Sequence, residues 1–234
     1  MTSELDGVDL QLLLPEIALT LGLAAIIIVP NLGDAMFRIP LTSFRIPVFI
    51  GGTRFPKTRD PRIPNWIAVG TLSLALLAST LSLLDPPESG RVGSSLLVDE
   101  FSSLLTNLFL CVLILCSLSA SQRLPADPKA TPPSNDDDEE SETRKTSALY
   151  DNRRQADFHI LLLTLGLGMS LMAKSTHLFM LFVSLELASL SSYVLVGFHK
   201  ESKEGGEAGT KYFIVGSVAS AVGIYWMSLL YLWN

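Results

Sequence analysis

The chain has few of the residues that build disulfide frameworks and metal centres. It contains only two cysteines and three histidines in 234 residues. Cys111 and Cys116 stand five apart inside one apolar run with no histidine nearby in the sequence, so we expect small buried hydrophobes and no metal site. No P-loop, GxSxG or HExxH motif occurs, and Gly166 and Gly168 lie within an apolar run rather than at a strand-to-helix turn. The motifs of soluble enzymes are therefore missing.

Charge is almost absent from six long stretches of the chain. Each stretch is about long enough to cross the hydrocarbon core of a bilayer as a helix, although the fourth is short. Transmembrane β-strands would alternate in polarity, and these stretches do not. The pattern predicts an all-α, polytopic membrane protein with six transmembrane helices. The stretches are Leu12–Val29, Trp66–Leu84, Phe101–Ala120, Phe158–Ala173, Leu178–Phe198 and Tyr212–Trp233.

Lysine and arginine are nearly absent from every second connection. Loop 85–100 has only Arg91, and the turn after the fourth stretch has only Lys174, whereas the other three connections hold 15 basic residues. The positive-inside rule then places both termini on the outer face of the membrane. Because the first basic residue is Arg38, the positive n-region of a signal peptide is also missing.

Composition divides the chain into three segments. Residues 1–121 hold the first three predicted helices, and residues 158–234 hold the last three. Between them, residues 122–157 carry four prolines and an acidic run at 136–140. Such a stretch buries too little apolar surface to offset its ordering entropy, so we expect a flexible cytoplasmic loop. It lacks the ligand spacing and turn glycine of an EF-hand.

Glu186 is the only charged residue between His177 and Phe198. Helical rise places it roughly 15 Å from either end of that run, near the middle of a bilayer. An acid at that depth costs about 2.5–3.5 kcal/mol, and it usually faces a protein interior or a water-filled path. We therefore expect Glu186 to handle protons or ions, the alternative being a structural acid bonded to Ser189 or Tyr193.

Lys211 stands one turn inside the start of the last predicted helix. It can snorkel and pair with Glu207 at i, i+4, which is worth a few tenths of a kcal/mol. Alternatively, it can relay protons at the cytoplasmic mouth toward Glu186. Position in the sequence leaves both interpretations open.

Several stretches resemble subunit N of the proton-translocating NADH–quinone oxidoreductase, respiratory complex I. They are GMSLMA at 168–173, LFVSLELASLSSY at 181–193, EAGTKYF at 207–213, LLPE at 13–16 and VDEF at 98–101. Antiporter subunits of multisubunit sodium–proton exchangers share the fold, but the combination of SLELxSLxxY with EAGxKYF favours subunit N.

The resemblance implies the roles of two residues. Glu186 would be the essential protonatable glutamate, and Lys211 would belong to the same buried charged chain, so these two are the predicted proton-relay residues. The family's subunit binds no flavin, iron–sulfur cluster or nicotinamide, which belong to partner subunits. The resemblance also implies other membrane-arm subunits as partners, no nucleic acid, and the bacterial inner membrane.

The chain departs from the family in length. Family members resemble a fourteen-helix antiporter-like fold, whereas this sequence ends after its sixth predicted helix. We expect a split, truncated or fragmentary subunit, with a separate chain carrying the later helices. Two other classes stay open: a non-transporting membrane scaffold or assembly protein, and a subunit of a cation–proton antiporter complex.

Overall fold

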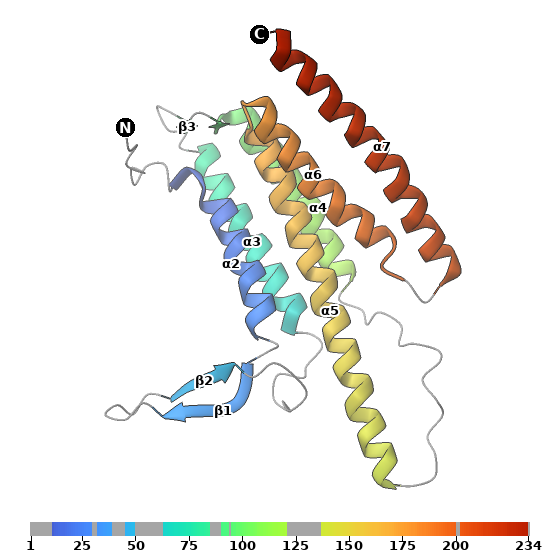
Figure 1. Ribbon diagram of the computed structural model, residues 1–234. Coiled ribbons are helices and arrows are strands. Elements are labelled where there is room, and N and C mark those ends of the chain that lie inside the picture. The colour runs from blue at the N-terminus through green and yellow to red at the C-terminus, as the bar shows by residue number, and fades with distance from the viewer. Residues whose placement is uncertain are drawn as a thin grey trace.

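The structure is a computed structural model, and over its described residues it is a bundle of apolar helices with two short hairpins (Figure 1). The backbone alone is described for residues 32–38, 45–49 and 137–153. The described residues are 11–29, 32–38, 45–49, 63–84, 90–93, 95–120, 137–199 and 202–233.

Six helices account for most of the described chain. Five of them are long and apolar enough to cross a membrane, α5 doing so with residues 154–174. The remaining one, α2, is apolar but has 15 residues, a rise of about 22 Å. These helices confirm the predicted all-α, polytopic membrane fold. Their bounds are α2 Leu14–Ile28, α3 Ile63–Leu84, α4 Glu100–Ser119, α5 Asp137–Lys174, α6 Leu178–Val196 and α7 Lys203–Trp233.

Two antiparallel hairpins lie at opposite ends of the bundle (Figure 1). The first pairs β1 (Leu32–Arg38) with β2 (Arg45–Phe49), between α2 and α3. The second pairs β3 (Arg91–Val92) with β4 (Leu96–Leu97), between α3 and α4. We call the two ends of the bundle the β1–β2 end and the β3–β4 end. The start of α2 and the turn between α5 and α6 lie at the β3–β4 end.

The expected flexible loop at 122–157 needs correction. Helix α5 begins at Asp137, so residues 137–157 are helical, while 122–136 lies outside the described residues. The sequence contains the reason. No proline or glycine occurs from 137 to 165, acidic residues occupy the first turn where the helix dipole favours them, and Arg144 follows Glu140 at i, i+4. The prediction of a flexible loop rested on the acidic and proline-rich composition and gave these helix signals too little weight.

One hydrophobic core joins α2, α3, α4 and α5. Its largest buried side chains come from all four helices, so α5 packs into the same core as the first three helices. Glycine permits close approach at one crossing, because a Cβ on Gly22 would collide with the Thr71 side chain. The buried core residues include Leu19 and Ile26 of α2, Leu72 of α3, Leu110 of α4 and Leu163 of α5.

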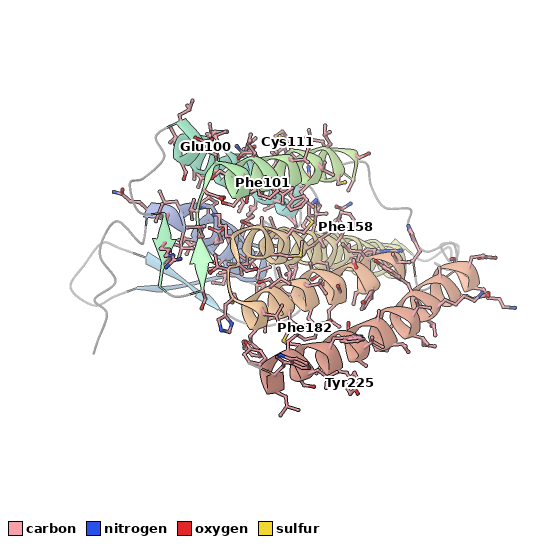
Figure 2. All side chains as sticks on the ribbon, turned by 90° about the horizontal axis from the view of Figure 1, so that it is seen from above. Glu100, Phe101, Cys111, Phe158, Phe182 and Tyr225 are labelled. Atoms are coloured by element: carbon pink, nitrogen blue, oxygen red, sulfur yellow. The ribbon has the colours of Figure 1, made fainter. Side chains whose placement is uncertain are left out.

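Helices α6 and α7 lie successively outside this core. Helix α6 packs tightly on α5, where a Cβ on Gly168 would lie 2.7 Å from the backbone nitrogen of Ala188. Helix α7 packs on α6 where Gly209 meets Gly197, and none of its described residues is buried. Figure 2, the view from above Figure 1, shows α7 with Tyr225 at the edge of the bundle.

Candidate functional site

Glu186 lies in the interior of α6. The helix begins after His177, whose Nδ1 accepts a hydrogen bond from the Phe179 N–H at 3.3 Å, and it ends at Gly197. Nine residues separate Glu186 from His177, a rise of about 14 Å. The side chain is half-buried, and its Oε1 is buried without a hydrogen-bond partner among the described residues. The structure therefore places a carboxylate with a free acceptor atom deep in an apolar helix.

Glu186 occupies the side of α6 that is turned away from α5. Gly168 of α5 packs against Ser184 and Ala188, so this is the side of α6 that meets the core. Residues two apart on a helix point about 160° away from each other, because each residue turns by 100°. Within the described chain, no hydrogen bond joins Glu186 to Ser189 or Tyr193, the two partners suggested for a purely structural acid.

Lys211 lies on the exposed surface of α7. Its Nζ is 2.5 Å from Oε1 of Glu207, and the two side chains are 73% and 56% exposed. The predicted i, i+4 pair is thus present. Among the described residues, Lys211 forms no ion pair with Glu186, so the relay role of Lys211 stays a prediction.

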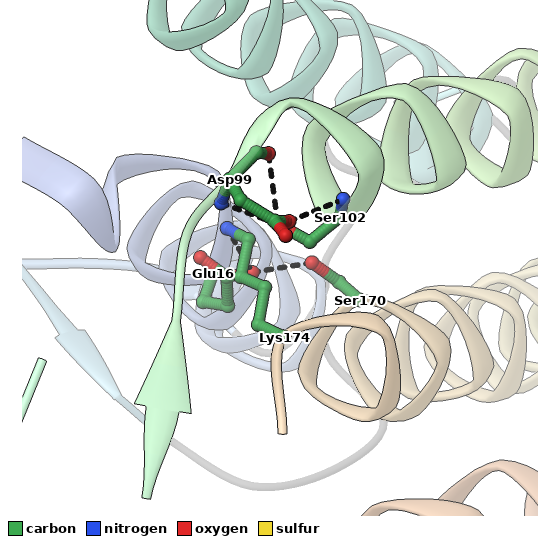
Figure 3. A network of polar contacts seen from close by, with 5 residues as sticks. All are labelled: Glu16, Asp99, Ser102, Ser170 and Lys174. Atoms are coloured by element: carbon green, nitrogen blue, oxygen red, sulfur yellow. Dashed lines mark hydrogen bonds and ion pairs between the residues drawn. The ribbon is translucent and has the colours of Figure 1, made fainter. Parts of the chain in front are cut away.

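A buried ion pair that the sequence did not indicate lies at the β3–β4 end. Lys174 Nζ is 2.7 Å from Glu16 Oε1, and the two side chains are only 2% and 7% exposed. Ser170 Oγ donates a short hydrogen bond to the same oxygen. The other carboxylate oxygen, Oε2, is buried and has no partner among the described residues. Figure 3 shows the three side chains beside Asp99 and Ser102, at the start of α4.

Helix ends position this pair. Glu16 is in the first turn of α2 and Lys174 in the last turn of α5. A helix N-terminus favours an anion and a C-terminus favours a cation, so each charge also meets the helix dipole that suits it. An apolar cluster packs at the same end, from the start of α2 and the β3–β4 hairpin: Leu12, Val92 and Val98, with Leu13 and Leu96 against them.

A second buried polar cluster lies toward the β1–β2 end. His159 of α5 is fully buried; its Nδ1 is 2.7 Å from the carbonyl oxygen of Gln155, and its Nε2 is 3.0 Å from the side-chain amide of Asn65. Ser117 of α4 contacts the same amide at 3.2 Å. His159 follows directly on Phe158, where the fourth apolar stretch begins, and it is buried because α5 starts well before that point.

From the sequence alone, Glu16 had no role of its own, and Lys174 counted only among the basic residues of the connections. The available signal was that each is a single charge at the end of an apolar run. Their contact joins positions 158 residues apart, which helical periodicity does not reveal. In the described part of the chain, no cluster of His, Cys, Asp or Glu could hold a metal ion.

A groove separates α6 from α7 beyond their close contact at Gly197 and Gly209. It encloses about 450 Å³ and is lined mainly by apolar side chains, with Ser189, Ser220 and Tyr193 as its polar members. Tyr193 fills the near end, with its ring edge-on to Tyr212 at 4.8 Å between centroids. The small residues of α7 therefore allow close packing at Gly209, which meets Gly197, and at Gly216, which meets Tyr193.

Comparison with known proteins finds a family that matches the last quarter of the chain and relatives that align along most of it. Residues 175–234, which include Glu186 and Lys211, match the family described as NADH:quinone oxidoreductase/Mrp antiporter, TM. A subunit N of NADH-quinone oxidoreductase from Paenibacillus sp. is 31% identical over 75% of this chain and 32% of its own length. That from Sphingopyxis alaskensis is 27% identical over 95% of this chain and 36% of its own length.

Similarity is higher over a shorter segment of the chain. A subunit N 1 of NADH-quinone oxidoreductase from Roseiflexus castenholzii is 48% identical over 75 residues, 32% of this chain and 14% of its own length. The chain spans about a third of the length of those relatives that align along most of it. These matches, together with the bundle of membrane-crossing helices, show that the chain belongs to the family of NADH-quinone oxidoreductase subunit N.

Proposed function

We propose that the chain is a membrane-arm subunit, or half of a split subunit, of an NADH–quinone oxidoreductase and contributes to proton translocation. The observation that carries this is Glu186, a carboxylate about 14 Å inside an apolar helix with one buried oxygen left without a partner. Membrane-buried acids of this kind mark ion and proton pathways. The names of the relatives support the same function.

In this proposal Glu186 takes up a proton on its carboxylate and releases it again. Its free oxygen leaves room for the proton, and its position away from α5 aims it at the side of α6 that the core does not cover. Lys211 acts near the start of α7 as an entry relay, which would require it to leave Glu207. Flavin, iron–sulfur and nicotinamide chemistry belong to partner subunits.

We further propose that helices outside this chain, carried by other membrane-arm subunits or a separate chain, cover α7. Its support is that α7 carries no buried residue and exposes Tyr225, Trp226 and Leu230. The membrane would be the bacterial inner membrane, with the β3–β4 end outside. The excess of lysine and arginine in the connections at the other end supports this orientation.

A cation–proton antiporter complex is the second candidate. The matching family joins both kinds of protein in its description, and it covers the segment that contains Glu186. The two candidates differ in their driving force. Proton movement that requires NADH favours the oxidoreductase, whereas sodium-dependent proton exchange without NADH favours the antiporter.

The test is Glu186→Gln, which keeps the shape of the side chain and removes its titration. In inverted membrane vesicles of the source organism, we expect the complex to assemble and NADH-driven proton uptake to fall. Glu207→Gln is the matched control, because it makes the same chemical change on an exposed residue. Normal proton uptake by an assembled Glu186→Gln complex would refute the proposal.

A further inference from the structure

We propose that Glu16, Ser170 and Lys174 form a second proton-exchanging site, separate from Glu186, at the β3–β4 end of the bundle. The inference rests on the proposed function in proton translocation and adds a site to it. Neither the sequence pattern nor the names of the relatives assigns a role to these residues. The geometry of the buried ion pair carries the argument.

The site can hold a proton on either partner. Oε1 of Glu16 accepts from Ser170 and lies 2.7 Å from Lys174 Nζ, while Oε2 is buried with no partner among the described residues. Transfer breaks one N–H bond of Lys174 and forms one O–H bond on Glu16, so both groups become neutral and the total charge stays zero. A further proton from water would recharge Lys174 and leave the site with one positive charge.

Burial removes part of the advantage that the ionic form has in water. Removing two charges from water costs several kcal/mol per ion, and their attraction repays that cost only with excellent geometry and full hydrogen bonding. Here one carboxylate oxygen lacks a hydrogen bond, so the ionic form is incompletely compensated. The neutral form requires no such compensation, so a buried pair of this kind is suited to exchange.

The two membrane-embedded neighbours α2 and α3 add almost no charge near the pair. Helix α3 carries no charged residue from Ile63 to Leu84, and Glu16 is the only charged residue of α2. Among the described residues at this end, the other charged groups are Asp99 and Glu100 at the start of α4 and Arg91 on β3, and all three are exposed. Asp99 caps α4 by accepting a hydrogen bond from the Ser102 N–H, and Figure 3 draws it in the same close view as the pair.

The site is also placed beyond Glu186 toward the β3–β4 end. Gly168 packs against Ser184 and Ala188, so it marks the level of Glu186 on the neighbouring helix. Ser170 and Lys174 lie two and six residues further along α5, about 3 and 9 Å by helical rise. If the β3–β4 end faces outward, the site lies on the release side of Glu186.

A purely structural clamp between α2 and α5 is the alternative. Lys174→Arg separates the two, because arginine keeps the positive charge but does not give up its proton in proteins. The double variant Glu16→Gln, Lys174→Met separates them differently. It removes both charges together, and replacing a whole buried pair by neutral groups is often tolerated structurally. A structural clamp should keep its function in Lys174→Arg, whereas a proton-exchanging site should lose its function in both variants.

The experiment measures assembly and NADH-driven proton uptake per NADH oxidised in inverted vesicles. We expect both variants to assemble and to lose most of the uptake. Full uptake in either assembled variant would overturn the proposal. Glu186→Gln is measured in parallel: if it alone lowers uptake, the second site fails and the proposed function stands, whereas full uptake there refutes the proposed function itself.

Infrared difference spectroscopy provides a readout that does not depend on those variants. The unmodified complex should show a protonated-carboxyl band that appears or disappears when NADH is added. Glu16→Asp keeps the charge and the pair, so it should assemble and shift that band. The absence of any NADH-dependent band sensitive to Glu16→Asp would overturn the proposal.

Discussion

Lys174 and Glu16 form an ion pair across the ends of α5 and α2, with 2.7 Å between Nζ and Oε1 and both side chains almost wholly buried. The pair joins α5 to α2, at the end where the β3–β4 hairpin also contacts the α5–α6 turn. Thr176, in that turn, donates its N–H to Ser95 at 2.9 Å. The position of the ion pair is therefore coupled to the position of the start of α6. Helix α6 carries Glu186 in its interior.

Removing one member of this pair should destabilise the bundle more than removing both charges. Lys174→Met leaves Glu16 buried and unpaired, and breaking a buried pair this way costs about 3–5 kcal/mol. Adding Glu16→Gln should recover much of that loss. Thermal unfolding of the assembled protein in mild detergent measures both, with Glu207→Gln on the exposed surface as the control. A double variant as unstable as Lys174→Met would contradict this account.

The buried contact between His159 and Asn65 should show energetic coupling. Each single replacement by leucine leaves the other polar group buried without its partner, which costs about 1–3 kcal/mol. Replacing both removes the His159–Asn65 contact from both sides and loses only the Ser117 contact that Asn65→Leu also loses, so the double variant should be less destabilised than the sum of the singles. A double-mutant cycle on the unfolding temperature measures this coupling, and strict additivity would show that the contact contributes nothing.

Alanine at two glycines of α7 should have opposite outcomes. A Cβ on Gly216 would collide with the Tyr193 ring, which is fixed by Tyr212 and Phe213, so Gly216→Ala should weaken the packing of α7 on α6. A Cβ on Gly223 would lie 3.7 Å from Phe182, an ordinary contact, so Gly223→Ala should be neutral or slightly stabilising. Disulfide cross-linking between α6 and α7 reports the difference. Equal cross-linking in both variants would contradict the observed packing.

The helices were predictable because apolar runs of membrane length leave few other structures for the chain. Hydrocarbon offers no hydrogen bonds to the backbone, so such runs fold as helices regardless of their neighbours. The early start of α5 was not predicted, since acidic and proline-rich composition around 122–140 suggested a loop. Local charge order, with acids first and Arg144 after them, was the better guide to the helix.

The candidate sites divide in the same way. Glu186 stands out in the sequence because a single charge in an apolar run is costly wherever the helix packs. Glu16, Lys174 and His159 do not, because their significance comes from burial between helices that are far apart in the sequence. Contacts of that kind depend on which helices pack together, and α5 had to be placed against α2 and α3 before they could be seen.

The orientation of the chain should follow its basic residues. A reporter placed after Arg54 should report the cytoplasm, because the connections at that end of the bundle contain most of the lysine and arginine. A reporter placed in the β3–β4 hairpin, after Gly93, should report the outer face. Two reporter enzymes measure these positions: one is active only outside the membrane, and the other is active only in the cytoplasm. An outer signal after Arg54 would reverse the assignment of both ends.

Replacement of Lys211 should be milder than replacement of Glu186. Lys211 is exposed and paired with Glu207 in an i, i+4 geometry, which contributes only about 0.2–0.5 kcal/mol to the helix. Lys211→Ala should therefore leave assembly unchanged and lower NADH-driven proton uptake by less than Glu186→Gln does. Glu207→Ala breaks the same pair while keeping the lysine, so it separates loss of the pair from loss of the relay. If Lys211→Ala lowers uptake and Glu207→Ala does not, Lys211 acts as a relay. Equal and small effects of both would leave Lys211 as a surface charge at the start of α7.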